Sequence, residues 1–154
     1  MKFEISMPSI ESILERGINV PISPKGHSWN QGVLGEKSRS KGVYIIHQHK
    51  NIQYVGKTSG DKMSFGMRLR RHFQEVAAGK HTYPRLLALS ETGPIQVSLF
   101  DIGEILELIR TESKKSILWT KDYISLFEAG LIITLEPKFQ TIDEPLDDVA
   151  SEKR

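Results

Sequence analysis

Side chains that handle protons or phosphate are concentrated between residues 44 and 72. The set comprises two tyrosines, a lysine, an arginine and a histidine: Tyr44, Tyr54, Lys57, Arg68 and His72. A guanidinium binds phosphate through two parallel hydrogen bonds, and imidazole accepts a proton near neutral pH. Either tyrosine alone has an ordinary structural explanation, because tyrosines are common in strands. Together they predict a site that acts on a phosphate-containing substrate.

Glu128 is the most anomalous residue outside that stretch. Its predicted helical neighbours are apolar: Ile124, Phe127 and Leu131. A carboxylate in an apolar stripe is costly unless something pairs with it. Two partners remain open, a metal ion or a buried ion pair, for example with Arg68. Mg²⁺ often takes only one or two protein carboxylates and completes its shell with water and substrate phosphate. One glutamate is therefore compatible with Mg²⁺-dependent (or Mn²⁺-dependent) phosphodiester hydrolysis.

Basic residues are concentrated in the same part of the chain. Between Lys37 and Arg85, 11 Lys and Arg stand against two acids, a net charge of +9, whereas the rest carries 10 basic and 17 acidic residues, a net charge of −7. This asymmetry indicates a polyanionic partner, although a solvated face has the same composition. His47 and His49 have a spacing that can bind metal, but polar hairpin residues are the commoner explanation.

The elements that would position these side chains can be predicted from periodicity. Residues 42–47 and 52–56 alternate as two strands joined by a polar turn, which brings Tyr44 and Tyr54 near each other. Apolar residues spaced three and four apart predict a helix from Phe65 to about Gly79. On that helix Arg68 and His72 share a face beside the apolar stripe, at the rim where helix meets sheet.

The remaining elements complete an α+β fold. We expect a short helix at 8–17, a loop at 18–40 with Trp29 as a plug over the core, and a second short helix at 83–89. A third strand is expected at 95–100, and the longest helix at 116–136; residues 104–110 are ambiguous. Three strands without strict βαβ alternation predict a small three-stranded antiparallel sheet flanked by helices.

Length and composition set outer limits. A chain of 154 residues is most simply one domain. We expect an N-terminal extension at 1–40 that packs on the core, a core at 41–141 and a flexible acidic tail at 142–154. The absence of cysteine excludes disulfides and thiol nucleophiles. With no long apolar run and no secretory signal, no membrane partner is expected and a cytoplasmic location is the default.

The ordered motifs resemble those of the GIY-YIG nucleases. The first signature reads Gly42-Val43-Tyr44 and the second Tyr54-Val55-Gly56, followed by Lys57. The helix arginine and histidine of that family match Arg68 and His72, and its metal-binding glutamate matches Glu128, which is followed by apolar residues and a proline. Where the family often has an asparagine shortly after that proline, this chain has Gln140. An amide is retained on a longer arm, which puts a direct role in doubt and leaves a backbone-positioning role open.

The resemblance implies a role for each matched residue. Glu128 would hold one Mg²⁺ or Mn²⁺ on the scissile phosphate, and Arg68 would neutralise that phosphate. Tyr44 would orient or deprotonate the attacking water, helped by the positive charge of Lys57. Tyr54 and His72 would position phosphate or water. The nucleic-acid contacts expected are Lys57, Arg68, Arg71 and Gln140.

These implications leave three functions open. The first is a restriction-type endonuclease that cuts double-stranded DNA, as a homodimer if its target is palindromic. The second is a monomer that nicks branched or damaged DNA in repair or recombination. The third is a nucleic-acid-binding module that has lost hydrolysis.

Overall fold

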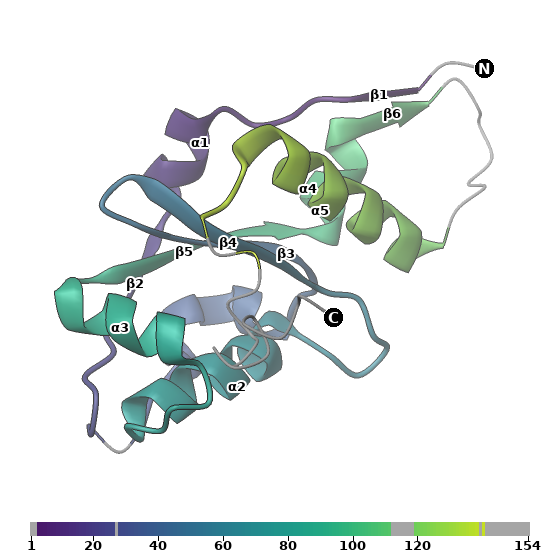
Figure 1. Cartoon of the computed structure of the whole chain (residues 1–154). Coiled ribbons are helices and arrows are strands. Elements are labelled where there is room, and N and C mark those ends of the chain that lie inside the picture. The colour runs from purple at the N-terminus through teal and green to yellow at the C-terminus, as the bar shows by residue number, and fades with distance from the viewer. Residues whose placement is uncertain (1–2, 27, 112–118, 139, 141–154) are drawn as a thin grey trace, which may run out of the picture.

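The computed structural model describes residues 3–26, 28–111, 119–138 and 140 (Figure 1). Its elements in chain order are β1 (Phe3–Ile5), α1 (Ile10–Glu15), β2 (Ile18–Val20), the 3₁₀-helical segment η1 (Gln31–Arg39), β3 (Gly42–Gln48), β4 (Asn51–Thr58), α2 (Phe65–Ala77), α3 (Pro84–Thr92), β5 (Ile95–Asp101), α4 (Ile102–Leu108), β6 (Ile109–Thr111) and α5 (Thr120–Leu135).

An antiparallel sheet with the strand order β2-β5-β3-β4 lies at the centre of the molecule. The predicted hairpin is present as β3 and β4, and β5 pairs with the other side of β3. His49 and Lys50 form the turn with positive φ angles of 51° and 66°, as a two-residue type I′ hairpin requires. Among the described strands, only β3 pairs with β4, so the outer side of β4 is an edge of the sheet.

The sheet has four strands, so our prediction of three was wrong. The additional strand β2 pairs antiparallel with β5, with Ile18 opposite Val97, and β1 and β6 form a separate two-stranded antiparallel sheet. Each of these strands has three residues, too few for an alternating pattern to stand out from a loop. The α+β class and the antiparallel pairing are confirmed.

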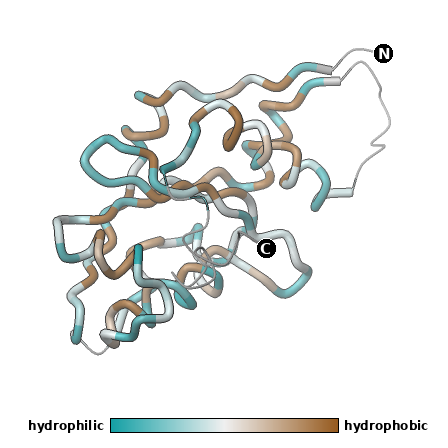
Figure 2. The backbone as a smooth tube through the Cα atoms, in the orientation of Figure 1, coloured by the Kyte–Doolittle hydropathy of each residue, from teal (hydrophilic) through white to brown (hydrophobic). Residues whose placement is uncertain are grey.

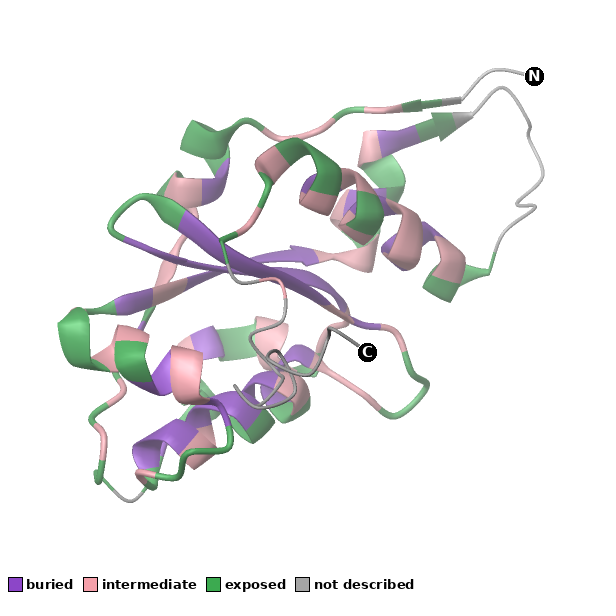
Figure 3. Ribbon diagram, viewed as in Figure 1, coloured by how far each residue is buried: buried purple, intermediate pink, exposed green. Residues whose placement is uncertain are grey.

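Helices cover both faces of the central sheet (Figure 1). Successive residues of β3 point to opposite faces, so Tyr44 and Ile46 pack with α2 and α3, whereas Val43 and Ile45 pack with α1, α4 and α5. The central strands are apolar in the hydropathy view (Figure 2) and buried in the exposure view (Figure 3), with exposed residues on the outer sides of the helices. The core therefore consists of two apolar layers, one on each face of the sheet.

The predicted helices are present, with some changes at their ends. Ser64 caps α2 through a 3.3 Å hydrogen bond from Met67 N to its Oγ, and Gly79 follows the helix with a φ of 71°. The ambiguous segment 104–110 is divided between α4 and β6, and the expected loop at 18–40 contains β2 and η1. The longest helix begins at Thr120; residues 116–118 and the tail at 142–154 lie outside the described residues.

Trp29 packs over the core as predicted. Its side chain is buried, and its ring meets the edge of Phe73 at a centroid distance of 5.1 Å. The backbone N–H of Trp29 donates to Gln74 Oε1 at 2.8 Å. These contacts fix the segment before η1 onto α2.

A network of four charged side chains joins α1, η1 and α4. Lys37 Nζ lies 2.5 Å from Asp101 Oδ2 and 2.9 Å from Glu104 Oε1, and Arg16 pairs with Glu104 and stacks over the ring of Phe100. Burial alone would raise the pKa values of the two carboxyls, but hydrogen bonds and the charges of Lys37 and Arg16 hold both pKa values below their usual range.

Among the described helices, none combines the length and apolar character that a membrane-spanning segment needs.

Candidate active site

Two of the predicted site residues form a hydrogen-bonded pair between the sheet and α2. Tyr44 lies in the central strand β3 with no exposed surface, and its hydroxyl is 3.2 Å from His72 Nε2. The Tyr54 ring lies beside it, with the two centroids 6.1 Å apart and the planes tilted by 42°. On its other side, His72 meets the Tyr83 ring edge-on at 4.8 Å. The imidazole is thus held between two phenol-bearing side chains.

Gly56 allows the two tyrosines to pack this closely. It lies directly opposite Tyr44 in the β3–β4 ladder. A Cβ on this residue would come within 2.8 Å of Tyr54 Cε2 and would overlap the Tyr44 ring. The glycine of the second motif is therefore required by the packing of both tyrosines.

On the other face of β4, Lys57 reaches across to α5. Its Nζ donates a 2.9 Å hydrogen bond to Ser125 Oγ and lies 3.9 Å from Glu128 Oε1. Ser125 and Glu128 are three residues apart, so they lie on one side of the helix. The Lys57 side chain is 39% exposed and that of Glu128 is 19% exposed, which leaves the pair open to solvent on one side.

Glu128 is a half-buried carboxylate between two cations. Burial raises its pKa above the usual value, and the positive charges of Lys57 and Arg68 partly offset that rise. The predicted apolar surroundings are present, because Ile124, Phe127 and Leu131 have no exposed surface. Of the two partners left open, an ion pair is present: Glu128 pairs with Lys57, and the charge of Arg68 also acts on this carboxylate.

Arg68 and Glu128 come from helices on opposite faces of the sheet. Arg68 lies on α2, below the sheet in Figure 1, whereas Glu128 lies on α5 above it. The positive charge of Arg68 lowers the pKa of Glu128 against the rise that burial causes, so the two side chains are within electrostatic reach. Arg71, one of the predicted nucleic-acid contacts, is exposed on the outer side of the same helix.

His72 does not lie at the rim where we had predicted it. Its side chain is 2% exposed and is enclosed by the sheet and α3. Counting residues around α2 placed His72 beside the apolar stripe, but α2 is covered by the sheet, η1 and α3, so its buried arc is wider than that stripe. Arg68, one turn earlier, keeps partial access to solvent.

The side-chain amide of Gln140 pairs with the outer edge of β4. Its Nε2 donates to Val55 O at 2.7 Å and its Oε1 accepts from Val55 N at 3.3 Å. Lys138 N extends the same pairing to Ile52 O at 3.1 Å. The longer amide therefore serves the backbone-positioning role that we left open, and it fixes the strand that carries Tyr54 and Lys57.

His47 and His49 are separated by the fold. His47 has no exposed surface, and its Nε2 lies 2.8 Å from Ser98 Oγ, which in turn donates to Ile13 O at 2.6 Å. His49 is exposed in the hairpin turn. This pair does not form a metal site. Nowhere among the described residues do three His, Asp or Glu side chains gather as metal ligands.

Five predicted residues thus lie in two adjoining groups at β4, with Tyr44, Tyr54 and His72 on one face and Lys57 and Glu128 on the other. The sixth, Arg68 on α2, acts on Glu128 through its charge. Ser125 was missed, because a lone helical serine carries no motif; its spacing of three residues from Glu128 is the only signal in the sequence.

Comparison of the chain with protein-family models, with curated proteins and with solved structures finds no match.

Proposed function

We propose that this protein is a metal-dependent endonuclease that hydrolyses DNA phosphodiester bonds, with a core arranged like that of the GIY-YIG nucleases. The observation that carries the proposal is the half-buried Glu128 carboxylate, flanked by Lys57 at 3.9 Å and by the charge of Arg68. A carboxylate with two cations beside it, open on one side, suits a phosphate held through a divalent ion. The basic character of residues 37–85 suits a polyanionic substrate.

The donor set fits Mg²⁺ or Mn²⁺. Both are hard cations that favour carboxylate oxygen, and Mg²⁺ keeps several waters when bound by one or two carboxylates. Glu128 offers one such group with partial access to solvent, and its 3.9 Å separation from Lys57 Nζ exceeds hydrogen-bond length. When bound, the ion would supply stabilisation for negative charge that develops on the phosphate.

The protein side chains have separate tasks in this proposal. Lys57 and Arg68 lower the electrostatic cost of bringing a phosphate next to Glu128. Arg68 offers guanidinium hydrogen bonds to two phosphate oxygens. Tyr44 and His72 share a hydrogen bond 3.2 Å long, so a proton lost by the phenol can be taken up by the imidazole. Ser125 holds Lys57 in place.

Incubation of mixed-sequence duplex DNA with the protein and Mg²⁺ or Mn²⁺, followed by sequencing of the cut ends, tests the proposal. We expect new ends that require the metal. Arg68→Ala should lower the cleavage rate roughly 100-fold or more, as loss of a charge-stabilising donor does, with the circular dichroism spectrum unchanged. The control is Arg110→Ala, an exposed arginine of β6 that is not one of the candidate site residues. Equal rates for the two variants would contradict the assigned site.

One observation favours a second function, a nucleic-acid-binding module without hydrolysis. The Tyr44 side chain has no exposed surface and its hydroxyl is engaged by His72, whereas activation of a water requires contact with it. In that case the protein would bind DNA with steep salt dependence and would leave it intact in Mg²⁺ and in Mn²⁺. Any metal-dependent cut that Arg68→Ala abolishes excludes this second function.

A further inference from the structure

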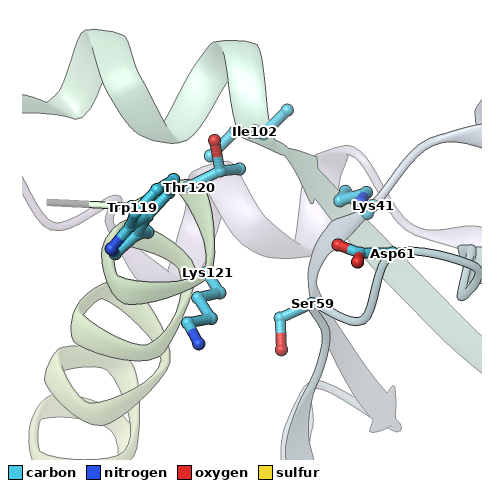
Figure 4. Close-up of a pocket in the computed structure, with 7 residues that line it drawn as sticks. All are labelled: Lys41, Ser59, Asp61, Ile102, Trp119, Thr120 and Lys121. Carbon is cyan, nitrogen blue, oxygen red and sulfur yellow. The ribbon is translucent and has the colours of Figure 1, made fainter.

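A cleft lies between the start of α5 and the loop that follows β4. It has a volume of about 570 Å³, within the roughly 300–1,000 Å³ of ligand sites. Figure 4 shows Trp119, Thr120 and Lys121 on one side and Ser59, Asp61 and Lys41 on the other, with Ile102 at one end. None of these residues belongs to the candidate active site.

Trp119 is the unusual residue of this cleft. Its side chain is 77% exposed, although tryptophan is one of the largest apolar side chains. Its backbone is fixed, because Trp119 N donates to Asp122 Oδ2 at 3.0 Å and Asp122 N donates back to Trp119 O at 2.8 Å. A single exposed apolar residue needs no explanation, but Trp119 is presented on a fixed backbone and borders a cleft with two lysines.

The charges of the cleft favour an anionic occupant. Lys41 and Lys121 stand against one acid, Asp61. The N-terminal end of α5, a helix of 16 residues, adds partial positive charge at the same place. An aromatic face combined with cations is the recurring arrangement for stacking a nucleobase beside its phosphate.

The cleft adjoins the candidate active site on two elements. Lys121 precedes Ser125 by four residues along α5, a rise of about 6 Å. Ser59 follows Lys57 by two residues of extended chain, about 6–7 Å. The cleft therefore adjoins the place where Lys57 and Glu128 would hold a phosphate, near enough for one strand to contact both.

We propose that this cleft is a subsite for one nucleotide of the DNA strand being cut, a short distance along the strand from the scissile phosphate. The base stacks on Trp119, and the phosphate is bound by Lys121 with Lys41 opposite. This inference rests on the proposed nuclease function and adds to it a contact that holds the strand in register. A base can reach a side-chain face in this way only where it is unpaired or unstacked, so single-stranded or distorted DNA should be bound best.

Iodide quenching of intrinsic fluorescence tests the subsite in the unmodified protein. The chain has two tryptophans, of which Trp29 is 5% exposed and Trp119 is 77% exposed, so iodide reports on Trp119. The probe is an unlabelled mixed-sequence single-stranded oligonucleotide, added in EDTA so that no metal-dependent cleavage occurs. We expect the emission of Trp119 to fall and its accessibility to iodide to be lost. Continued quenching by iodide at saturating oligonucleotide would overturn the subsite.

Substitution provides the second measurement. For this measurement the same oligonucleotide carries a fluorescein label. Trp119→Ala should weaken its binding roughly tenfold, as loss of a stacking platform does. Lys121→Ala should reduce the slope of log K against log salt by about 1. The matched control is Ile133→Ala, since Ile133 is also 77% exposed on α5 and lies outside the cleft.

The outcomes separate this inference from the function beneath it. If the wild-type protein cuts DNA but Trp119→Ala binds as tightly as Ile133→Ala, the subsite is wrong and the nuclease proposal stands. If the wild-type protein neither binds nor cuts any DNA, both are wrong. Binding without cleavage, together with loss of iodide accessibility, supports nucleotide binding in the cleft and contradicts the nuclease proposal.

Discussion

Replacement of Gly56 by alanine tests the packing on which the candidate active site depends. The new Cβ would lie within 2.8 Å of Tyr54 Cε2 and would overlap the Tyr44 ring. Both rings are buried, Tyr44 fully, and Tyr44 is also engaged by His72, so neither can rotate away without loss of a contact. An added methyl group in such a core costs roughly 1–3 kcal/mol. In a domain of this size that corresponds to a fall in melting temperature of roughly 2–12 °C.

Gly60→Ala is the matched control for this substitution. A Cβ there meets only Met63 Cβ at 3.7 Å, an ordinary van der Waals contact. Thermal unfolding followed by circular dichroism should therefore show Gly60→Ala close to the wild type and Gly56→Ala well below it. In the cleavage assay, at a temperature where both variants are folded, Gly56→Ala should be the slower enzyme, because Tyr44 and Tyr54 are displaced. Equal melting temperatures for the two variants would refute this account of the glycine.

Three further predictions concern stability. Burial holds the pKa of His47 below its ordinary value. Neutral His47 therefore contributes fully to the free energy of unfolding above about pH 6.5. This contribution is lost as the pH falls toward the folded-state pKa, by up to about 1.4 kcal/mol per pH unit. Urea unfolding at a series of pH values should show this slope in the wild type and a shallower one in His47→Gln. Lys37→Ala should lower the free energy of unfolding by about 1 kcal/mol and Lys62→Ala, at an exposed position, by much less; equal unfolding midpoints in urea would count against the network. Gln140→Ala removes both hydrogen bonds to Val55 and should lower the free energy of unfolding by roughly 1–3 kcal/mol. Hydrogen exchange at the Val55 amide should become faster, and an unchanged exchange rate would contradict the edge pairing.

The central hairpin and α2 could be predicted because their patterns are long and regular. Gly42–Gln48 and Asn51–Thr58 alternate around a short polar turn, and the apolar stripe of α2 keeps helical spacing over three turns. Strand β2 and η1 could not be predicted, because they lie among the turn-forming residues of 18–40. Strand β2 gains its backbone pairing from β5, and η1 packs against α2. Short elements depend on tertiary partners that local patterns do not report.

For the candidate site, residue types could be predicted better than their environments. Motif and spacing identified the residues that lie at β4: Tyr44 on one face of the sheet, and Lys57 and Glu128 on the other. The burial of His72 was missed because the ring of Tyr83, the residue just before α3, packs against it. The hydrogen bond that Lys57 donates to Ser125 was missed because it depends on how α5 crosses the sheet. Contacts made between distant elements are set by the packing of whole layers, which periodicity within one element does not contain.

Metal-dependent cleavage by Glu128→Gln tests the central claim most directly. The substitution keeps the shape of the side chain and removes the negative charge that would hold Mg²⁺ or Mn²⁺. Its control is Glu107→Gln, which makes the same change at an exposed position of α4. We predict that the wild type and Glu107→Gln cut mixed-sequence DNA at equal rates in Mg²⁺, and that Glu128→Gln is slower by roughly 100-fold or more while it still binds the DNA. Cleavage by Glu128→Gln at the rate of Glu107→Gln would contradict the claim.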